Sequence, residues 1–502
     1  MTQEQVRHIG ETHGTPCYVY DEASLKRQAR AALAFPSAYG LTVRYAMKAL
    51  PNAAVLQTFD RLGLHVDASS GFEVRRAVAA GVAPERISLS SQECPEDLDE
   101  LLDLGMKFNA CSLRQLTRFG ELRPGSRGDQ LGVRFNPGLG SGGTGKTNVG
   151  GPSSSFGIWH ESMPEVRAIL DKYDLEPARV HTHIGSGSDP AVWQRVAGLS
   201  LALCEQIPSV SVLNLGGGYK VGRMSTEKST DLAVVGEPVK GTFEEFAERT
   251  GRKLHLEVEP GTFLVANAGS LVTRVQDIVA TGETGHFFLK LDSGMTELLR
   301  PSLYGAQHPT ILVPSNSGGA SRGDGTYVLV GHCCESGDLV TPAPDEPEVL
   351  LPRAMGHAAT TGDFIVVEGA GAYCSSMATK NYNSCASHLR KHARAPRTPP
   401  CPSPARPHSL PCPASLSLPP LSSPTLSVGY PVPPRMRCCG AHLRHSSLRR
   451  HTTPRTVSRD SRRHSFPEAP EVMLDEAGDA HLIRKKQPIQ DIWMHEVAYT
   501  PK

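Results

Sequence analysis

The sequence predicts an α/β protein with a (β/α)8 TIM-type barrel, followed by a smaller C-terminal antiparallel β domain. Short apolar runs alternate with helix-compatible stretches from about residue 21 to 265, as expected for parallel strands covered by helices. Polar or glycine-rich residues directly follow most of these runs, at positions that a barrel gathers into one pocket. After residue 265 the sequence is β-rich with few helical runs, which favours antiparallel strands.

Seven segments of the first region are predicted to be buried strands, because each contains a short apolar run bounded by turn-forming residues. They are residues 41–49, 64–70, 87–91, 131–137, 179–187, 210–218 and 254–260. Between several of them lie stretches with helical character, such as 71–81 and 164–175. Seven strands over about 245 residues suit an eight-stranded barrel, and a doubly wound open sheet is the alternative.

Composition divides the chain into five segments. We expect residues 1–20 to be an N-terminal strand segment packing with the β domain, 21–265 to be the barrel, and 266–384 to be the β domain, with strands near 270–282, 286–294, 326–340 and 362–373. Residues 385–465 hold 15 Pro, 14 Lys/Arg and no Glu, so they are predicted to be a disordered insertion, consistent with a retained intron. Residues 466–502 are predicted to supply the final strands and tail of the β domain.

The charge balance excludes several classes of function. The net charge is +1, but the insertion carries +13, which leaves 38 Lys/Arg against 50 Asp/Glu elsewhere, and an acidic body does not predict nucleic-acid binding. No apolar run is long enough to span a membrane, and the N-terminus has no signal-peptide core. A cytoplasmic protein is expected, with a plastid possible if the start is truncated. The 12 cysteines include no zinc-type pairs.

The stretch GSGGTGKT, residues 140–147, matches the phosphate-loop pattern of nucleotide-binding proteins. A functional phosphate loop opens a helix whose N-terminus holds the phosphates. Here the next residues are NVGGPSSSFG, which place two glycines and a proline where that helix should begin. We therefore interpret the match as a glycine-rich loop and not as a nucleotide site.

Four features of the barrel region carry chemistry. Lys48 ends a strand among apolar residues, where the pKa of a lysine can fall and its amine can form a Schiff base. Three consecutive glycines, 216–218, let backbone amides approach a phosphate. His181 and His183 lie on the same side of a strand. They could be metal ligands, although no third ligand is obvious, or one imidazole could stack on a cofactor ring. Glu259 could protonate a pyridine nitrogen, which makes the ring an electron sink.

Cys334 and Glu335 add a thiol and an acid in a loop of the β domain. Alone each signal is weak: Lys48 could be a solvated surface lysine, and the three glycines could form a flexible turn. Together they supply a lysine for covalent attachment, a phosphate cradle, a ring partner and a proton donor. That combination predicts pyridoxal 5′-phosphate chemistry.

On these residues the chain resembles the diaminopimelate decarboxylases, pyridoxal-phosphate enzymes with an alanine-racemase-like fold. The matching stretches include RYAMKA, VDASS, HTHIGSGSD, GGGY, EPG, RPSLYGA, CESGD, GAGAY and NYNS, in that order. The resemblance covers about residues 15–384 and resumes at 466, so that removing the 81-residue insertion leaves 421 residues. It implies decarboxylation of meso-diaminopimelate to L-lysine and CO2, the last step of lysine biosynthesis, by a homodimer with shared active sites.

The resemblance also implies a role for each site residue. The expected catalytic residues are Lys48, which holds the cofactor, Cys334 as proton donor and His183 against the ring face. The other expected cofactor contacts are Asp67, Arg134, Ser186, Gly216, Gly217, Gly218, Glu259, Gly261 and Tyr373. The expected substrate contacts are Arg300, Tyr304, Tyr373 and Glu335, with Cys334 and Glu335 entering from the second subunit. No metal is expected.

One position departs from the family pattern. The family reads E-P-G-R, and that arginine grips the carboxylate at the far end of the substrate, whereas this chain has Thr262. Arg300 could compensate, or the substrate could be D-lysine or D-ornithine, which lack that carboxylate. Two further alternatives are a racemase, which CESGD disfavours, and a homologue whose catalysis the insertion impairs.

Overall fold

The computed structural model describes residues 1–140, 150–183, 185, 187–316, 323–379, 382–384 and 470–485. Residues 1–390 and 465–502 belong to one compact unit, and the second unit, 391–464, lies outside the described residues. All statements below concern the described part of the first unit.

Eight parallel strands close into a barrel, which confirms the predicted fold class and excludes the doubly wound open sheet. The strands are β2 (Leu41–Ala46), β3 (His65–Ala68), β4 (Ile87–Leu89), β5 (Lys107–Ala110), β6 (Arg127–Asn136), β8 (Glu176–Thr182), β9 (Val212–Asn214) and β10 (His255–Val258). The order is β5-β4-β3-β2-β10-β9-β8-β6, and parallel pairing of β5 with β6 closes the ring. The two-residue β7 (Ile158–Trp159) pairs with the end of β6.

Strand β5 is absent from the seven segments predicted above. Its sequence, KFNA, places the fully buried Asn109 inside the barrel, where an aliphatic residue is usual. The Asn109 amide nitrogen donates to the hydroxyls of Ser88 and Ser90, and its amide oxygen accepts from Arg179. These bonds satisfy the buried amide, and they explain why an apolar pattern alone misses this strand.

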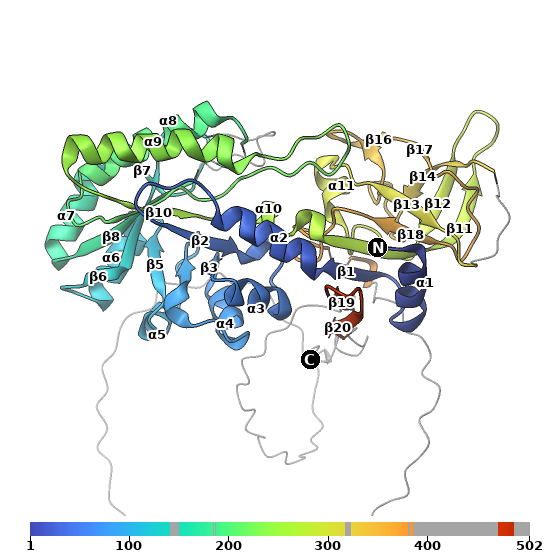
Figure 1. The fold of residues 1–502 in the computed structure, drawn as a ribbon, viewed down its shortest axis with the longest axis horizontal. Helices are drawn as coiled ribbons and strands as arrows, with labels where there is room; N and C mark the ends of the chain where they lie inside the picture. The colour runs from blue at the N-terminus through green and yellow to red at the C-terminus, as the bar shows by residue number, and fades with distance from the viewer. Residues whose placement is uncertain are drawn as a thin grey trace, which may run out of the picture. The chain divides into compact units, whose positions relative to one another are not determined.

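Helices surround the barrel strands (Figure 1). They are α2 (Glu22–Leu33), α3 (Ala53–Arg61), α4 (Gly71–Ala79), α5 (Leu98–Asp103), α6 (Leu113–Leu122), α7 (Met163–Tyr173), α8 (Pro190–Glu205), α9 (Leu232–Thr250) and the short α10 (Thr262–Val265). Several begin directly at a capping side chain after a strand: Asn52, Ser70, Ser112, Asp189 and Asp231 each accept a backbone N–H of the following first turn. The caps turn the chain sharply from strand to helix, which leaves the carboxyl ends of the strands free for a site.

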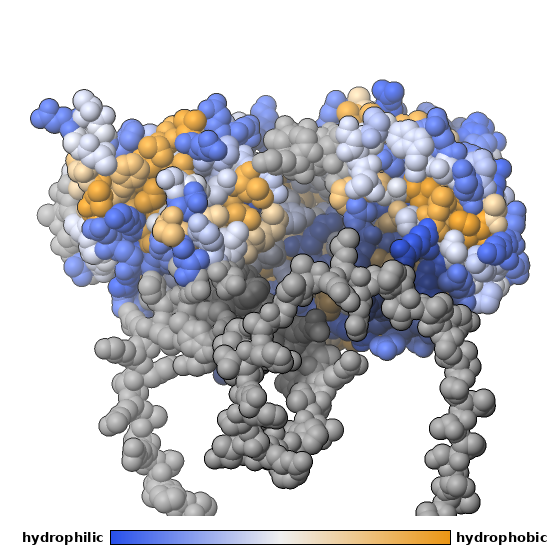
Figure 2. All heavy atoms as spheres, turned by 180° about the vertical axis from the view of Figure 1, so that it is seen from behind, coloured by the Kyte–Doolittle hydropathy of each residue, from blue (hydrophilic) through white to orange (hydrophobic). Residues whose placement is uncertain are grey.

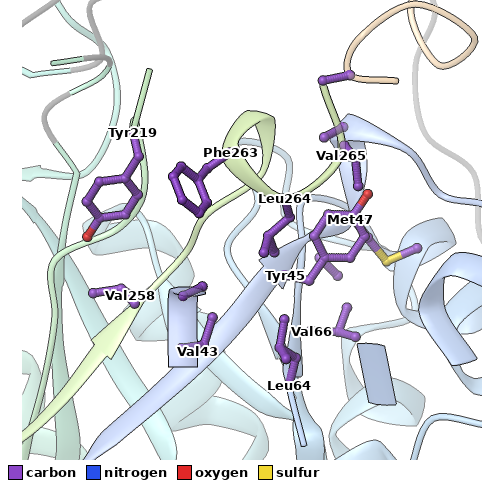
Figure 3. Packing of buried hydrophobic residues seen from close by; sticks show 14 of the residues in the cluster. Val43, Tyr45, Met47, Leu64, Val66, Tyr219, Val258, Phe263, Leu264 and Val265 are labelled. Atoms are coloured by element: carbon purple, nitrogen blue, oxygen red, sulfur yellow. The ribbon is translucent and has the colours of Figure 1, made fainter. Parts of the chain in front are cut away.

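Apolar side chains of the barrel strands form a buried cluster next to the candidate site. Val43, Tyr45, Met47, Val66 and Val258 are at most 2% exposed, and Figure 3 shows their side chains packed together beneath α10. Each such buried side chain stabilises the fold by roughly 1.5–3 kcal/mol relative to exposure. This packing fixes the strand ends that carry the polar residues of the site.

The second sheet is mainly antiparallel, as expected. Its strands are β1 (Cys17–Asp21), β11 (Gly269–Ala280), β12 (Phe287–Leu291), β13 (Thr310–Val313), β14 (Thr326–Val330), β17 (Arg353–Ala354), β18 (Phe364–Val367), β19 (Glu471–Leu474) and β20 (Ala480–Arg484). Two pairs are parallel, β1 with β19 and β12 with β14. A separate hairpin joins β15 (Pro342–Ala343) to β16 (Glu346–Leu350), and α11 (Leu299–Tyr304) lies between β12 and β13 in the chain.

The two ends of the chain meet in this sheet. Strand β1 lies between β11 and β19, as Figure 1 shows, and helix α1 (Gln3–Thr12) buries Val6 and Ile9 against the same apolar cluster as Val472. The buried carboxylate of Glu471 accepts hydrogen bonds from Tyr20 and Asn52, which tie β19 to the start of the barrel. Residues after the insertion are therefore integral to the folded unit.

Large apolar side chains are exposed on both the barrel and the β domain, among them Phe72, Val234, Phe287 and Ile311. Figure 2 shows hydrophobic areas interspersed with hydrophilic ones on the face that it draws. Across the described ranges, none of the helices combines the length and the apolarity needed to cross a bilayer.

Candidate active site

A cavity of about 1140 Å³ lies at the carboxyl ends of the barrel strands and brings most of the predicted site residues together. Those that line it are Lys48, Asp67, Arg134, His183, Gly217, Gly218, Glu259, Gly261, Arg300, Tyr304 and Tyr373. Thr262 lines it as well. Gly216 lies directly behind His183. Cys334 and Glu335 do not line the cavity, and Ser186 is outside the described residues.

Lys48 lies in a 3-10 turn (Met47–Ala49) that directly follows β2. Its neighbours Met47 and Ala49 are buried, whereas the lysine side chain is accessible from the cavity and surrounded by protein. Burial alone would lower the pKa of Lys48, but Tyr373 and the carboxylates of the pocket outweigh it, so the pKa is raised. The expectation that this pKa falls is therefore wrong, because the apolar flanks of Lys48 point into the core and its amine faces acidic groups.

Two buried carboxyl groups that line the pocket, Glu259 and Asp67, have pKa values shifted in opposite directions. Burial would raise the pKa of Glu259, but His181, His183 and Lys48 outweigh it and hold the pKa well below its usual range. Burial and the neighbouring Glu259 raise the pKa of Asp67 well above its ordinary value. A pair whose environments push its pKa values apart is typical of catalytic sites. Of these two, Glu259 is thus the carboxyl group that stays ionised.

Glu259 is fixed by its neighbours. Its Oε1 accepts from Asn214 Nδ2 at 2.7 Å, and its Oε2 lies 3.3 Å from Nε2 of the buried His181. The same Asn214 amide reaches Glu257 at 3.2 Å, and its oxygen accepts the Gly216 N–H at 2.8 Å. One asparagine therefore positions both the carboxylate and the start of the glycine segment.

The two histidines play different structural parts. Burial lowers the pKa of His181, whose Nδ1 lies 3.3 Å from the Ser90 hydroxyl within the barrel. His183 lies past the end of β8, lines the cavity, and has its pKa lowered well below the ordinary value by burial and then by Arg134. Its buried Nδ1 has no hydrogen-bond partner in the described structure. No group of three or more potential metal ligands occurs among the described residues.

The glycine segment requires glycine at two positions. A Cβ at Gly217 would lie 2.0 Å from the Glu259 carbonyl oxygen, and one at Gly216 would lie 2.6 Å from His183 Nδ1. Gly216 also has a positive φ of 71°, which favours glycine. The segment is therefore packed tightly on one side and open to the cavity on the other, as a backbone cradle for a phosphate requires.

Two further predicted residues, Arg134 and Tyr373, frame the cavity. The guanidinium carbon of Arg134 lies 5.4 Å from the centre of the Phe156 ring, and its side chain is 7% exposed. Tyr373 adopts a positive φ of 56°, and its N–H donates to the Ala49 carbonyl at 2.9 Å, which brings the β-domain loop against the Lys48 turn. These residues, the unpartnered nitrogen of His183 and the glycine cradle fit a flat, phosphate-bearing cofactor.

Helix α11 and the loop after it supply the opposite wall. Arg300 donates from Nη1 to Nε2 of His308 at 3.3 Å, and Tyr304 lines the cavity from the last turn of α11. Arg223, which follows the glycine segment, lines the same wall. Neither Arg223 nor Asn214 was singled out from the sequence, although both lie within five residues of the three glycines.

Cys334 and Glu335 are exposed and lie outside the cavity of their own chain. The Asn383 amide donates to Cys334 Sγ at 2.9 Å and accepts the Cys334 N–H at 3.1 Å, while the Tyr382 hydroxyl donates to Glu335 at 3.4 Å. Asn383 was also not singled out from the sequence. One side chain, Asn383, thus holds both the thiol and the backbone of Cys334, an arrangement that a purely solvent-facing loop does not require.

Comparison with known proteins agrees with this geometry. Residues 22–266 match the family model described as pyridoxal-dependent decarboxylase, pyridoxal binding domain. The chain is 32% identical over 401 residues to a diaminopimelate decarboxylase of Escherichia coli K12, covering 76% of this chain and 90% of the relative. It is also 32% identical over 383 residues to one of Streptomyces coelicolor, with 74% and 83% covered.

Solved structures give the same result. A crystal structure of a diaminopimelate decarboxylase is similar with a TM-score of 0.76 at 27% identity, covering 99% of this chain and 96% of that one. The Helicobacter pylori diaminopimelate decarboxylase complexed with L-lysine shares the fold with a TM-score of 0.69 at 23% identity, covering 97% and 98%. The match in sequence, fold and cofactor-binding region establishes that the chain belongs to the diaminopimelate decarboxylase family of pyridoxal-dependent carboxy-lyases.

Proposed function

We propose that the chain decarboxylates meso-diaminopimelate to L-lysine and CO2, using pyridoxal 5′-phosphate in a pocket that a second copy of the chain completes. The observation that carries the proposal is the position of Lys48 among Glu259, the glycine cradle and His183 in one cavity. Bound pyridoxal phosphate supplies a ring that accepts the electron pair left when CO2 departs.

The residues of this chain divide the remaining work. Lys48 Nζ would hold the cofactor covalently between turnovers and release it to the substrate amine. Glu259, the ionised acid of the pocket, would keep a proton on the ring nitrogen, while neutral His183 would pack on the ring face. The amides of Gly216, Gly217 and Gly218 would bind the phosphate. Asp67 and Arg134 would frame the ring near Lys48.

Proton return to the α-carbon is assigned to the Cys334 thiol of a partner subunit. Support comes from the exposure of Cys334 and Glu335 outside their own cavity and from the hydrogen bonds of Asn383 and Tyr382 that hold them. Within its own chain Cys334 is not among the residues that line the cavity. A homodimer with shared sites gives both residues a function, with Glu335 contacting the substrate.

The dimer is tested by mixing two inactive variants. K48A removes the attachment site and C334A removes the proton donor, so each homodimer has only defective pockets. A mixed dimer would contain one pocket with both native residues, and random mixing is expected to restore roughly a quarter of the wild-type activity. Mixtures that remain as inactive as their parents would contradict shared sites.

A second candidate activity, decarboxylation of D-lysine or D-ornithine, is favoured by one observation. Thr262 stands where the family has an arginine for the distal carboxylate, and it lines the cavity. The discriminating measurement is CO2 release from meso-diaminopimelate, D-lysine and D-ornithine under the same conditions. A kcat/KM that is highest for meso-diaminopimelate supports the first proposal, and a preference for either simple D-amino acid refutes it.

A further inference from the structure

The wall of the cavity opposite the strand ends contains two guanidinium groups without a carboxylate partner in the described structure. Arg223 donates from Nε to the Gly369 carbonyl oxygen at 2.9 Å, and Arg300 donates from Nη1 to His308 Nε2 at 3.3 Å. Both acceptors are neutral backbone or ring atoms. Nη2 of Arg223 is buried and has no hydrogen-bond partner among the described residues.

His308 does not neutralise these charges. Its Nδ1 donates to the Glu368 carbonyl oxygen at 2.9 Å, so its Nε2 carries the lone pair that accepts from Arg300. Burial, Arg223 and Arg300 hold the pKa of His308 well below its ordinary value. The histidine is therefore neutral, and its effect is to orient the Arg300 guanidinium.

The position of Arg223 is built into the fold. A Cβ on Gly369 would lie 2.9 Å from Arg223 Cγ, so the arginine stem packs where only glycine leaves room, and Gly369 has a φ of 65°. Burial, and then the neighbouring Arg300, lowers the pKa of Arg223 to about 9. The exposed Glu227 offsets this lowering only in part, so an anionic ligand would still reduce the cost of burying the Arg223 charge.

The other cations of this wall do not share these properties. Lys220 and Lys228 also line the cavity, but both are exposed to solvent, where water can hydrate an ammonium group. Arg223 is held by its neighbours in one place, and a guanidinium matches the fork geometry of carboxylate and phosphate oxygens.

We propose that Arg223, together with Arg300, binds an oxyanion of the ligand; where this oxyanion is the distal carboxylate, the pair replaces the arginine that Thr262 leaves absent. Arg223, Arg300 and Thr262 line the same cavity, so the missing charge is supplied from a different loop. The oxyanion is either the distal carboxylate of the substrate or the phosphate of the cofactor. The carboxylate alternative rests on the proposed function, whereas the phosphate alternative does not depend on the substrate.

Two substitutions test the proposal. R223Q removes the charge, and R223M also keeps an apolar stem against Gly369 so that the loop can retain its packing. R195Q, on the exposed face of α8, is the matched control for loss of one positive charge. Two ratios are measured for each protein. The first is the dissociation constant of pyridoxal divided by that of pyridoxal phosphate, obtained from the absorbance of apoprotein reconstituted with each compound. The second is the KM for meso-diaminopimelate divided by the KM for D-lysine.

If Arg223 binds the phosphate, its loss weakens binding of pyridoxal phosphate by roughly ten- to a hundredfold and leaves pyridoxal unaffected. If Arg223 binds the distal carboxylate, the cofactor ratio is unchanged and KM for meso-diaminopimelate rises by a similar factor relative to D-lysine. T262R in the R223Q background, which restores the arginine of the family pattern, is expected to recover most of the loss in KM for meso-diaminopimelate and none of a loss in affinity for pyridoxal phosphate.

The proposal is overturned if R223Q or R223M folds and both ratios stay within twofold of the wild-type values. Failure of the proposed function gives a different result, because wild-type protein would then release CO2 from D-lysine or D-ornithine and not from meso-diaminopimelate. The cofactor-binding ratio would still test Arg223 in that case, since it does not use a substrate.

Discussion

Glu257 lies one layer beneath the candidate site and neutralises two buried arginines. Its Oε1 lies 2.6 Å from Arg44 Nη2 and its Oε2 lies 3.1 Å from Arg179 Nε, and each of the three side chains is at most 5% exposed. Replacing Glu257 by glutamine keeps the shape and removes the charge. We predict that E257Q is strongly destabilised, because two guanidinium groups then share a buried layer without their carboxylate.

The magnitude follows from the pKa of Glu257. Burial would raise this pKa, but Arg44 and Arg179 outweigh it and lower the pKa from 4.5 to about 2. At 1.36 kcal/mol per pKa unit, the native state favours the ionised carboxylate by about 3 kcal/mol relative to the unfolded chain. Removing one partner of a buried ion pair typically costs about 3–5 kcal/mol, which agrees.

The sign of the pH dependence is also fixed. Because the folded pKa is lowered, the contribution is complete above pH 4.5 and is lost as the pH falls toward 2. The assay is the free energy of unfolding from urea titrations, measured at neutral pH and at several acidic values. Wild-type protein should lose stability with falling pH more steeply than E257Q.

The matched control is E244Q, which removes an exposed carboxylate on α9. A cost below about 1 kcal/mol for E257Q, with an unchanged pH dependence, would refute the argument. If E257Q does not fold, the triple variant R44M/R179M/E257L provides the second test, since an apolar replacement of the whole network is expected to fold. The side-chain amide oxygen introduced by E257Q can still accept from Asn214, so cofactor affinity should change less than stability.

Three further predictions concern single residues. K48A is expected to lose the visible absorbance of the covalently bound cofactor, and pyridoxal phosphate should dialyse away from it; retained absorbance would exclude Lys48 as the attachment site. N383A should lower kcat by roughly three- to tenfold with cofactor absorbance unchanged, because Cys334 loses the amide that orients its thiol; an unaltered kcat would count against this role. Burial raises the pKa of Glu297 to about 7, so the free energy of unfolding of the wild type should fall as the pH rises from 4.5 through 7. In urea titrations, E297Q should be up to about 3 kcal/mol more stable than the wild type at pH 8 and similar to it at pH 4.5. Equal stabilities at pH 8 would contradict the burial argument.

The barrel and its pocket could be predicted because the relevant signals are local. A continuous apolar run followed by a polar residue marks both a buried parallel strand and the site at its end, as for β2 with Lys48 and β10 with Glu259. The signal fails at β5, where Asn109 is buried through hydrogen bonds that the sequence does not display. It also fails for the parallel pairing of β1 with β19, because no local pattern records a partner more than 400 residues away.

Motif matching and physical reading of the pocket answer different questions about specificity. The E-P-G-R pattern places a charge at one sequence position, so Thr262 appears as a loss when the motif alone is compared. A ligand, however, responds to where a guanidinium lies in space and not to which loop supplies it. Arg223, held by Gly369 on the loop that also carries Tyr373, places a guanidinium in the cavity from a position that the motif does not cover. If the pair Arg223 and Arg300 binds the distal carboxylate, as proposed above, a variant that lacks both should lose any discrimination based on that carboxylate.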